Sequence, residues 1–175
     1  MQLVKRKAES IAPGETAMDI AEDPECFSEV MRCTNSIEKY ISHCRHKMVK
    51  RDFTPPEVIY IYGPPGSGKT KYVYDTEQSP FRVPDVHGSW RDGYALDEAV
   101  VFNNIESGRL TRRSDFLEQI DRYPISVPVK GGFTWWKPRR IYITSLETPE
   151  QFASVFQDPR EFTRRLTKVI HLPGI

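Results

Sequence analysis

Short runs of β-branched and aromatic residues alternate with a helical pattern in the second part of the chain. The runs at 57–62, 99–102 and 140–145 read EVIYIY, AVVF and RIYITS, and each has the length and composition of a buried strand. Between the last two, SDFLEQIDRY at 114–123 has the apolar spacing of an amphipathic helix. Strands that alternate with helices predict an α/β domain with a mainly parallel sheet.

The first third of the chain has helical periodicity instead. Apolar side chains recur at helical spacing between Ser36 and Met48, and Lys and Arg occupy much of the opposite face. Asp23 followed by Pro24 is typical of a helix start, because a carboxylate caps the first turn and proline fits inside it. We expect a loose lead-in at 1–22, a small helical segment at 23–54 and the main domain at 55–175. The helical segment either packs against the main domain or joins subunits.

Composition narrows the class of protein. With 38% hydrophobic and 28% charged residues, the 175-residue chain is typical of a folded globular protein. Its formal net charge is +1, so any nucleic-acid binding must come from a local basic patch. No apolar run approaches the roughly 20 residues of a membrane helix, so we expect no membrane partner. Three cysteines without a secretory signal predict reduced thiols inside a cell.

The residues that follow the first strand match a phosphate-binding loop. They read Gly63-Pro64-Pro65-Gly66-Ser67-Gly68-Lys69-Thr70, which is the full G-x-x-x-x-G-K-[ST] pattern. Its glycines allow successive N–H groups to point at one anion at the start of a helix. Lys69 would reach the β- and γ-phosphates, and the Thr70 hydroxyl would bind Mg²⁺. The pattern therefore predicts a site for a nucleoside triphosphate with Mg²⁺.

A basic and aromatic stretch at 130–140 is the second candidate site. KGGFTWWKPRR has no acid and carries the cations Lys130, Lys137, Arg139 and Arg140. Such cations meet phosphates, while aromatic rings stack on bases of any sequence. Trp135 and Trp136 are adjacent, so on a strand they face opposite ways and only one packs inward. The alternative is a hairpin whose tryptophans serve the core and whose cations are solvated.

Six short elements follow one another between residue 57 and about residue 172. They are GPPGSGKT, WRDGY at 90–94, AVVF, DRYP at 121–124 with VPVKGG at 127–132, IYITS, and FTRRL at 162–166. In this order they resemble the superfamily 3 helicase domain of the replication-initiator (Rep) proteins of small circular single-stranded DNA viruses. The resemblance implies an AAA+-like P-loop NTPase fold, preceded by a helical oligomerisation segment.

The resemblance also implies an activity and its partners. Such a domain hydrolyses ATP, assembles as a homo-oligomeric ring, often a hexamer, and moves along single-stranded DNA, or RNA, during rolling-circle replication in the host nucleus. Lys130, Gly131 and Gly132 match the hairpin of the family that contacts nucleic acid. Arg164 and Arg165 match arginines of which one can serve the ATP of a neighbouring subunit. Their alternative is a charged helix face.

The chain departs from the family pattern at the ends of two strands. Asn103 and Asn104 stand where the family has acids that bind Mg²⁺ and help to activate water. An amide can coordinate through its oxygen, so Thr70 and Asn103 are the candidate magnesium ligands, but it is no base at neutral pH. Leu146 stands where the family has an asparagine that senses the γ-phosphate. We therefore predict slow or absent hydrolysis.

Three explanations for the missing acids stay open. They are engineered asparagines, which would leave Leu146 unexplained; natural divergence; or an acid supplied by Asp97, Glu98 or Glu106, of which Glu106 is the best placed. The candidate catalytic residues are Lys69, Asn103, Asn104, Glu106, Arg164 and Arg165. Without hydrolysis, the alternative function is a nucleotide-dependent oligomeric scaffold that binds nucleic acid. The nuclease motifs of complete Rep proteins do not occur in residues 1–56, so origin nicking is not predicted.

Overall fold

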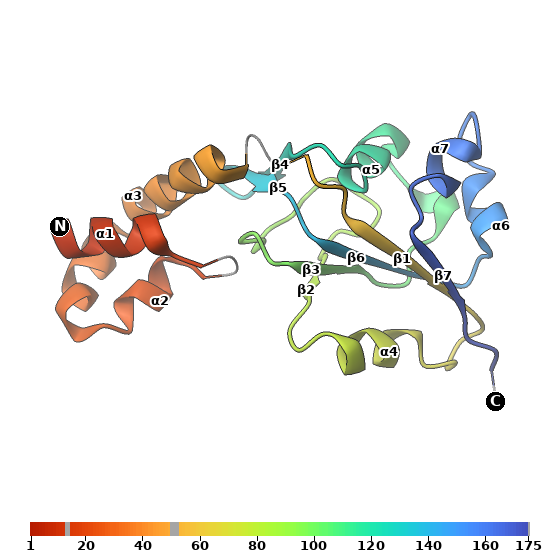
Figure 1. Ribbon diagram of the computed structural model, residues 1–175, viewed down its shortest axis with the longest axis horizontal. Coiled ribbons are helices and arrows are strands. Elements are labelled where there is room, and N and C mark those ends of the chain that lie inside the picture. The colour runs from red at the N-terminus through yellow and green to blue at the C-terminus, as the bar shows by residue number, and fades with distance from the viewer. Residues whose placement is uncertain (13–14, 50–52, 175) are drawn as a thin grey trace.

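The computed structural model describes residues 1–12, 15–49 and 53–174, with the backbone alone at Met48. A helical unit lies at one end of an elongated molecule and an α/β domain at the other (Figure 1). In the described residues, the helical unit consists of α1 (Gln2–Ser10), α2 (Ala17–Ala21) and α3 (Pro24–Val49). The first strand of the α/β domain then begins at Glu57.

The helical unit has a core of its own, formed where α1 and α2 pack against α3. The predicted helix start is confirmed, and the Asp23 carboxylate accepts a hydrogen bond from the Glu25 amide at 2.9 Å. The expectation of a loose lead-in at 1–22 is not met, because α1 and α2 lie there. Helices this short are unstable alone and need tertiary packing, which local composition does not reveal. The buried apolar side chains are Val4, Ala8, Ile11, Ala17, Ile20, Ala21, Cys26, Val30, Ile37 and Ile41.

Five strands in the described part of the chain form one sheet, in the order β2-β3-β6-β1-β7, and every neighbouring pair is parallel. β1, β3 and β6 are the three segments that the sequence predicts as buried strands, and their residues are almost all buried. The predicted α/β class with a mainly parallel sheet is confirmed. The strands are β1 (Glu57–Tyr62), β2 (Phe81–Arg82), β3 (Ala99–Phe102), β6 (Arg140–Ser145) and β7 (Lys168–His171).

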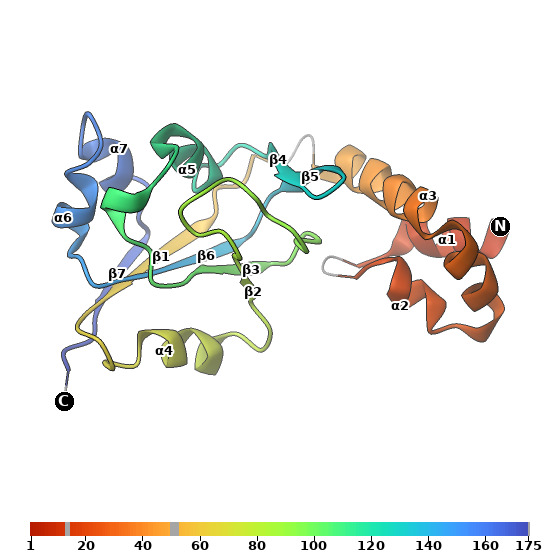
Figure 2. The ribbon, with the colours of Figure 1, turned by 180° about the vertical axis from the view of Figure 1, so that it is seen from behind.

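Helices cover the two faces of the sheet unequally (Figures 1 and 2). On one face lie α5 (Arg113–Gln119), α6 (Pro149–Ala153) and α7 (Arg160–Thr163), and on the other lies α4 (Lys69–Thr76). The more covered face holds an aromatic cluster in which the rings of Phe152 and Phe162 lie 4.8 Å apart. This face therefore carries the larger hydrophobic core. Other aromatic members of that core are Tyr60, Phe102, Phe116 and Phe156.

The antiparallel hairpin of β4 (Ile125–Val129) and β5 (Gly132–Trp136) lies on the side of the domain that faces the helical unit (Figure 1). At the other end of the domain, beyond the carboxyl ends of the strands, the segments that follow β1, β3 and β6 come together, because parallel strands end on the same side. The short 3₁₀ turn η1 (Ser107–Arg109) follows β3 there. In the described parts of the chain, no helix combines the length and the apolar character that crossing a membrane requires.

Candidate functional site

The segment predicted as a phosphate loop, Gly63–Thr70, comprises the loop between β1 and α4 and the first two residues of α4. Gly66 and Gly68 have φ angles of 77° and 86°, in the left-handed region that residues with a side chain rarely adopt. At Gly63, a side chain would collide with the carbonyl oxygen of Leu172. Because α4 begins directly after Gly68, the free amides at the start of this helix face the loop.

Lys69 is buried against the phosphate loop. Its Nζ donates to the carbonyl oxygens of Gly63 at 2.7 Å and Pro64 at 2.8 Å, and to Ser67 Oγ at 3.4 Å. Burial lowers the pKa of Lys69. An ammonium group held among backbone amides suits a polyphosphate, whose oxygens would replace these carbonyls as acceptors. The donor set therefore fits a nucleoside triphosphate.

The Thr70 hydroxyl contacts the end of β3. It donates to Asn103 Oδ1 at 2.7 Å, and the Thr144 hydroxyl of β6 donates to the same oxygen at 3.2 Å. The two predicted magnesium ligands are thus in direct contact, and both offer the oxygen atoms that Mg²⁺ prefers. In the described residues, no group of three or more His, Cys, Asp or Glu side chains could hold a metal.

A cleft of about 470 Å³ opens beside the phosphate loop. Glu106 is the one acid among the described residues that line it, and its exposed carboxylate accepts from Arg109 at 3.3 Å. Asp97 and Glu98 lie outside the lining, so Glu106 is the alternative acid that the geometry favours. Leu146 is 56% exposed in this lining and offers no polar group. The lining residues are Pro65, Gly66, Gly68, Lys69, Thr70, Lys71, Asn104, Ile105, Glu106 and Leu146.

The backbone of the loop that follows β3 is fixed on two sides. The Asn104 amide, in a residue with a φ of 54°, donates to Thr144 Oγ1 at 2.8 Å. The Glu106 amide donates to His87 Nε2 at 3.0 Å. Burial, and then the charge of Arg109, lower the pKa of His87, which favours the neutral ring that can accept this bond. Sequence reasoning missed His87, because a single histidine in a loop gives no signal.

Arg164 and Arg165 differ in their surroundings. Arg165 is half-buried, and it forms an ion pair with Asp121 at 2.6 Å and also donates to the carbonyl oxygen of Glu161. Arg164 is exposed and, like Arg165, lines a cavity of about 610 Å³ beside Glu57, the first residue of β1. The phosphate loop follows the other end of β1, so neither arginine lies at the nucleotide site of its own chain.

Two of the predicted nucleic-acid contacts, Trp136 and Lys137, are buried in the interior instead. Trp136 is 2% exposed and its indole Nε1 donates to Gln119 O at 2.8 Å. Lys137 is buried, and its Nζ donates to the carbonyl oxygens of Arg122 and Thr54. The structure therefore corrects the prediction for these two side chains, whose partners come from distant segments that sequence spacing cannot identify.

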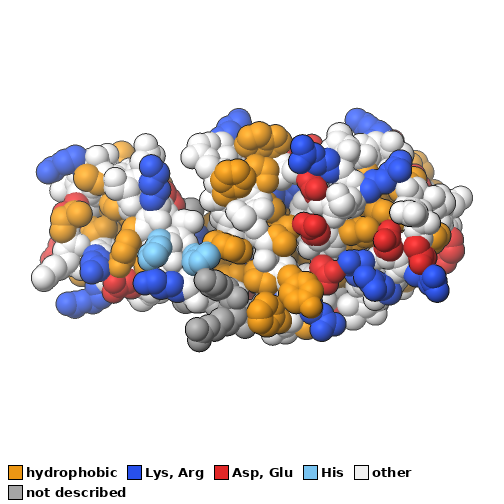
Figure 3. Space-filling model, turned by 90° about the horizontal axis from the view of Figure 1, so that it is seen from above, with side chains coloured by type: hydrophobic (Ala, Val, Ile, Leu, Met, Phe, Trp, Pro, Cys, Tyr) orange, Lys and Arg blue, Asp and Glu red, His pale blue; other side chains and the backbone are white. Residues whose placement is uncertain are grey.

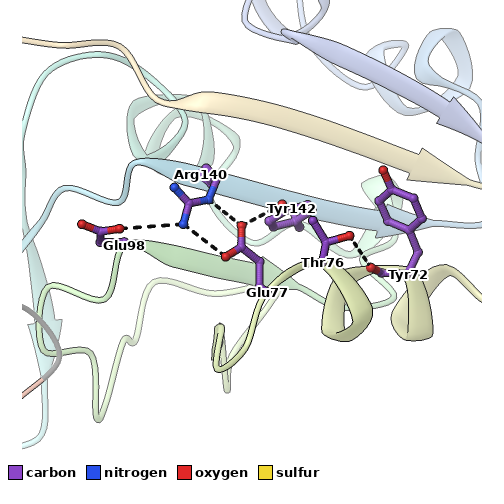
Figure 4. Close-up of polar contacts among 6 residues, drawn as sticks. All are labelled: Tyr72, Thr76, Glu77, Glu98, Arg140 and Tyr142. Carbon is purple, nitrogen blue, oxygen red and sulfur yellow. Dashed lines mark hydrogen bonds and ion pairs between the residues drawn. The ribbon is translucent and has the colours of Figure 1, made fainter.

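Arg140, another predicted nucleic-acid contact, is partly exposed and pairs with acids of its own domain. Its guanidinium forms an ion pair with Glu77 at 2.5 Å and lies 3.8 Å from Glu98, on the face of the sheet near α4 (Figure 4). Tyr142 donates to the same Glu77 carboxylate at 2.8 Å. The hydrogen bonds from Arg140 lower the pKa of Glu77. Arg140 thus stabilises the start of β6 and is not part of the hairpin surface.

The exposed part of the hairpin is its tip. Lys130 and Gly131 form the turn, Gly132 begins β5, and all three are exposed; Phe133 beside them is 70% exposed. Trp135 is half-buried, and its ring centroid lies 4.6 Å from that of His46 on α3. Arg139 is exposed beyond the end of β5. The ring of Phe133 is therefore more accessible to solvent than that of Trp135.

Hydrophobic side chains gather on the surface of the α/β domain where it approaches the helical unit (Figure 3). Tyr123, immediately before the hairpin, is 59% exposed, and its ring lies 5.9 Å from that of Phe53 in an edge-on arrangement. Exposed aromatic rings beside a basic turn are typical of surfaces that bind single-stranded nucleic acid.

The chain is similar to replication-associated proteins of circular DNA viruses. It is 40% identical over 119 residues to that of Beak and feather disease virus, which covers 68% of this chain and 39% of the relative. It is 37% identical over 129 residues to that of Porcine circovirus 2, which covers 71% of this chain and 40% of the relative. It is 30% identical over 122 residues to that of Human associated cyclovirus 1, which covers 66% of this chain and 41% of the relative.

A scan against models of protein families finds no match. The chain spans about two fifths of the length of the relatives to which it is similar. Over the aligned part it is 30–40% identical to the three relatives named above, and it has the α/β fold with a mainly parallel sheet that the resemblance implies. The chain belongs to the replication-associated (Rep) proteins of small circular single-stranded DNA viruses.

Proposed function

We propose that this chain binds ATP with Mg²⁺ and acts as a Rep-type helicase domain on single-stranded nucleic acid during viral replication. The observation that carries the proposal is the phosphate loop, in which buried Lys69 and the Thr70 hydroxyl lie beside a cleft of about 470 Å³. Relatives named replication-associated proteins support the role in replication. The host nucleus is the compartment where such a role would be carried out.

Each residue of the site has a physical task in this proposal. The amides of the phosphate loop and the Lys69 ammonium would hold the β- and γ-phosphates. Thr70 and Asn103 would supply oxygen ligands to Mg²⁺, which stabilises negative charge on the phosphates. Glu106 is the carboxylate in the cleft that could accept a proton, and it forms an exposed ion pair with Arg109 at 3.3 Å.

Hydrolysis is proposed to be slow. Asn103 and Asn104 stand where a carboxylate would orient water, and an amide cannot take up the proton. Leu146 offers no hydrogen bond to the γ-phosphate. These neutral side chains favour a second candidate function, a scaffold that assembles when ATP binds and holds nucleic acid without unwinding it.

The partners follow from the exposed groups. Lys130 and Arg139 would meet phosphates of single-stranded DNA or RNA, and Phe133 would stack on a base. Arg164 lies at the opposite end of β1 from the phosphate loop and would reach ATP only in a neighbouring subunit. This placement supports a homo-oligomeric ring, for which we propose a hexamer.

Binding and turnover of ATP, each with and without single-stranded DNA, test the proposal. We expect a fluorescent ATP analogue with Mg²⁺ to bind and turnover to stay below about 1 s⁻¹. Changing Asn103→Asp together with Asn104→Asp should raise turnover by about 10²-fold or more, whereas Asn35→Asp on exposed α3 is the control. ATP-dependent unwinding of a tailed duplex separates a helicase from a scaffold. Absence of nucleotide binding at millimolar concentration would overturn both.

A further inference from the structure

The segment Asp85–Tyr94 lines neither of the two proposed sites. One end of it forms hydrogen bonds with the β4–β5 hairpin, the proposed nucleic-acid contact. Its contacts with the hairpin are made by backbone groups of β4, the turn and the residue after β5, so they do not depend on flexible side chains there. They are Arg91 N to Pro128 O at 3.0 Å, Lys130 N to the Asp92 carboxylate, and Lys137 N to the Tyr94 hydroxyl at 3.2 Å.

The same segment is bonded at its other end to the loop that lines the nucleotide cleft. His87 Nε2 accepts from the Glu106 amide at 3.0 Å. The His87 carbonyl accepts from the amide of Thr111 at 2.9 Å and from its hydroxyl at 2.8 Å. His87 therefore joins both ends of the turn 106–111, whose first residue is the acid of the cleft.

Arg91 makes the middle of the segment rigid. Its guanidinium is fully buried and lies 5.2 Å from the ring of Phe102 and 5.5 Å from that of Trp136, which belongs to the hairpin. Although burial lowers its pKa to about 10, the group is charged at neutral pH. Its hydrogen bonds run to Asp85 O at 2.9 Å, Gly88 O at 3.0 Å, Trp90 O at 2.7 Å and Gln119 Oε1 at 2.7 Å.

We propose that the segment Asp85–Tyr94 couples the hairpin to the nucleotide cleft, with Asp92, Arg91 and His87 as positioning residues. The inference rests on the proposed function and adds a path within one chain between the two ligands. A continuous series of hydrogen bonds and packed side chains can carry such coupling. Arg91 donates hydrogen bonds to three backbone carbonyls of the segment, so the segment moves as one unit. A shift of the turn at Lys130 would therefore move His87 and, through it, Glu106. By linkage, nucleotide and DNA change the affinity for each other by the same factor.

Two matched pairs of substitutions test the path at its two ends. His87→Ala removes the acceptor for the Glu106 amide, whereas the amide oxygen of His87→Gln can replace it. Asp92→Ala removes the acceptor for the Lys130 amide, whereas Asp92→Asn retains one. His43→Ala, at an exposed site on α3, is the control for the loss of an imidazole.

The measurement uses the full 175-residue chain. The dissociation constant of a fluorescent ATP analogue with Mg²⁺ is determined with and without saturating oligothymidylate, and the ratio of the two is the coupling factor. We expect a factor of about 5 or more for the unmodified chain, for the two amide variants and for His43→Ala. For His87→Ala and Asp92→Ala we expect a factor near 1.

Each other outcome has a defined meaning. A full coupling factor in both alanine variants would overturn the path, and so would a factor of 1 in an unmodified chain that binds both ligands. An unmodified chain that fails to bind nucleotide or oligothymidylate would overturn the proposed function as well. Thermal melting identifies a variant that does not fold, in which case the pair at the other end of the segment decides. The affinity for oligothymidylate, measured with and without nucleotide, must give the same factor.

Discussion

Phe133→Ala and Trp136→Ala should affect different properties, DNA affinity and stability, although the two residues lie on the same strand of the hairpin. Phe133 is 70% exposed at the tip, whereas Trp136 is 2% exposed. The former should weaken DNA binding and leave the free energy of unfolding almost unchanged. The latter should lower the free energy of unfolding.

The size of the Trp136 effect follows from its contacts. Replacing a buried tryptophan by alanine typically costs about 3–5 kcal/mol. Here the change also removes the hydrogen bond from the indole N–H to Gln119 O and the ring that packs against the Arg91 guanidinium. For a protein of this length, each kcal/mol corresponds to about 2–4 °C, so the melting temperature should fall by roughly 6–20 °C.

The size of the Phe133 effect follows from base stacking. Stacking on an aromatic side chain contributes about 1–3 kcal/mol per base, which is roughly 5- to 150-fold in affinity. A substitution at an exposed site usually changes the free energy of unfolding by less than about 0.5 kcal/mol. Phe27, which is 53% exposed on α3, provides the matched control Phe27→Ala.

Thermal melting by circular dichroism and fluorescence anisotropy with labelled oligothymidylate, at one salt concentration, measure the two effects. Unchanged DNA affinity in Phe133→Ala would refute the assignment of the hairpin tip. A melting temperature of Trp136→Ala within about 2 °C of the unmodified chain would refute its structural role.

Three further predictions concern the phosphate loop and the sheet. Lys69→Ala should weaken binding of a fluorescent ATP analogue by at least about tenfold, while Lys39→Ala on α3 should not; equal affinities would contradict the role of the ammonium. Gly63→Ala should lower the melting temperature, because the new methyl group would collide with Leu172 O; an unchanged melting curve would show that the loop can move away. Because Arg140 lowers the pKa of Glu77 below its ordinary value of 4.5, this carboxylate stabilises the fold above that pH and loses its contribution as the pH falls through the lowered pKa. Glu77→Gln should therefore flatten the acid side of the stability curve, and an identical acid slope would contradict the ion pair.

Local sequence signals predict the parts of this fold that depend on neighbouring residues. The strands β1, β3 and β6 are short runs of β-branched and aromatic residues, and the phosphate loop is defined by its glycines and Lys69. Since the strands are parallel, their order along the chain also predicts that Thr70, Asn103 and Leu146 approach one edge. Thr70 does bond to Asn103, at 2.7 Å.

Side chains whose partners are distant in sequence could not be predicted in this way. Strand alternation requires that one of Trp135 and Trp136 faces inward, but it does not say which. Lys137 looks like a DNA contact in a basic stretch, yet it is buried beneath carbonyls of residues 54 and 122. Arg91 lies in a recognisable element, but its role as a buried donor to the segment 85–90 depends on tertiary packing.

The contacts of Asn103 show why the site can keep its shape without an acid. Its Oδ1 accepts hydrogen bonds from the hydroxyls of Thr70 and Thr144, which a neutral amide oxygen can do as well as a carboxylate. The amide lacks two properties of a carboxylate: a negative charge near Mg²⁺ and the ability to take up a proton from water. Because positioning and proton transfer depend on different properties of this side chain, we expect nucleotide affinity to persist where turnover is lost. A chain that hydrolyses ATP rapidly with Asn103 in place would require Glu106 to supply the base.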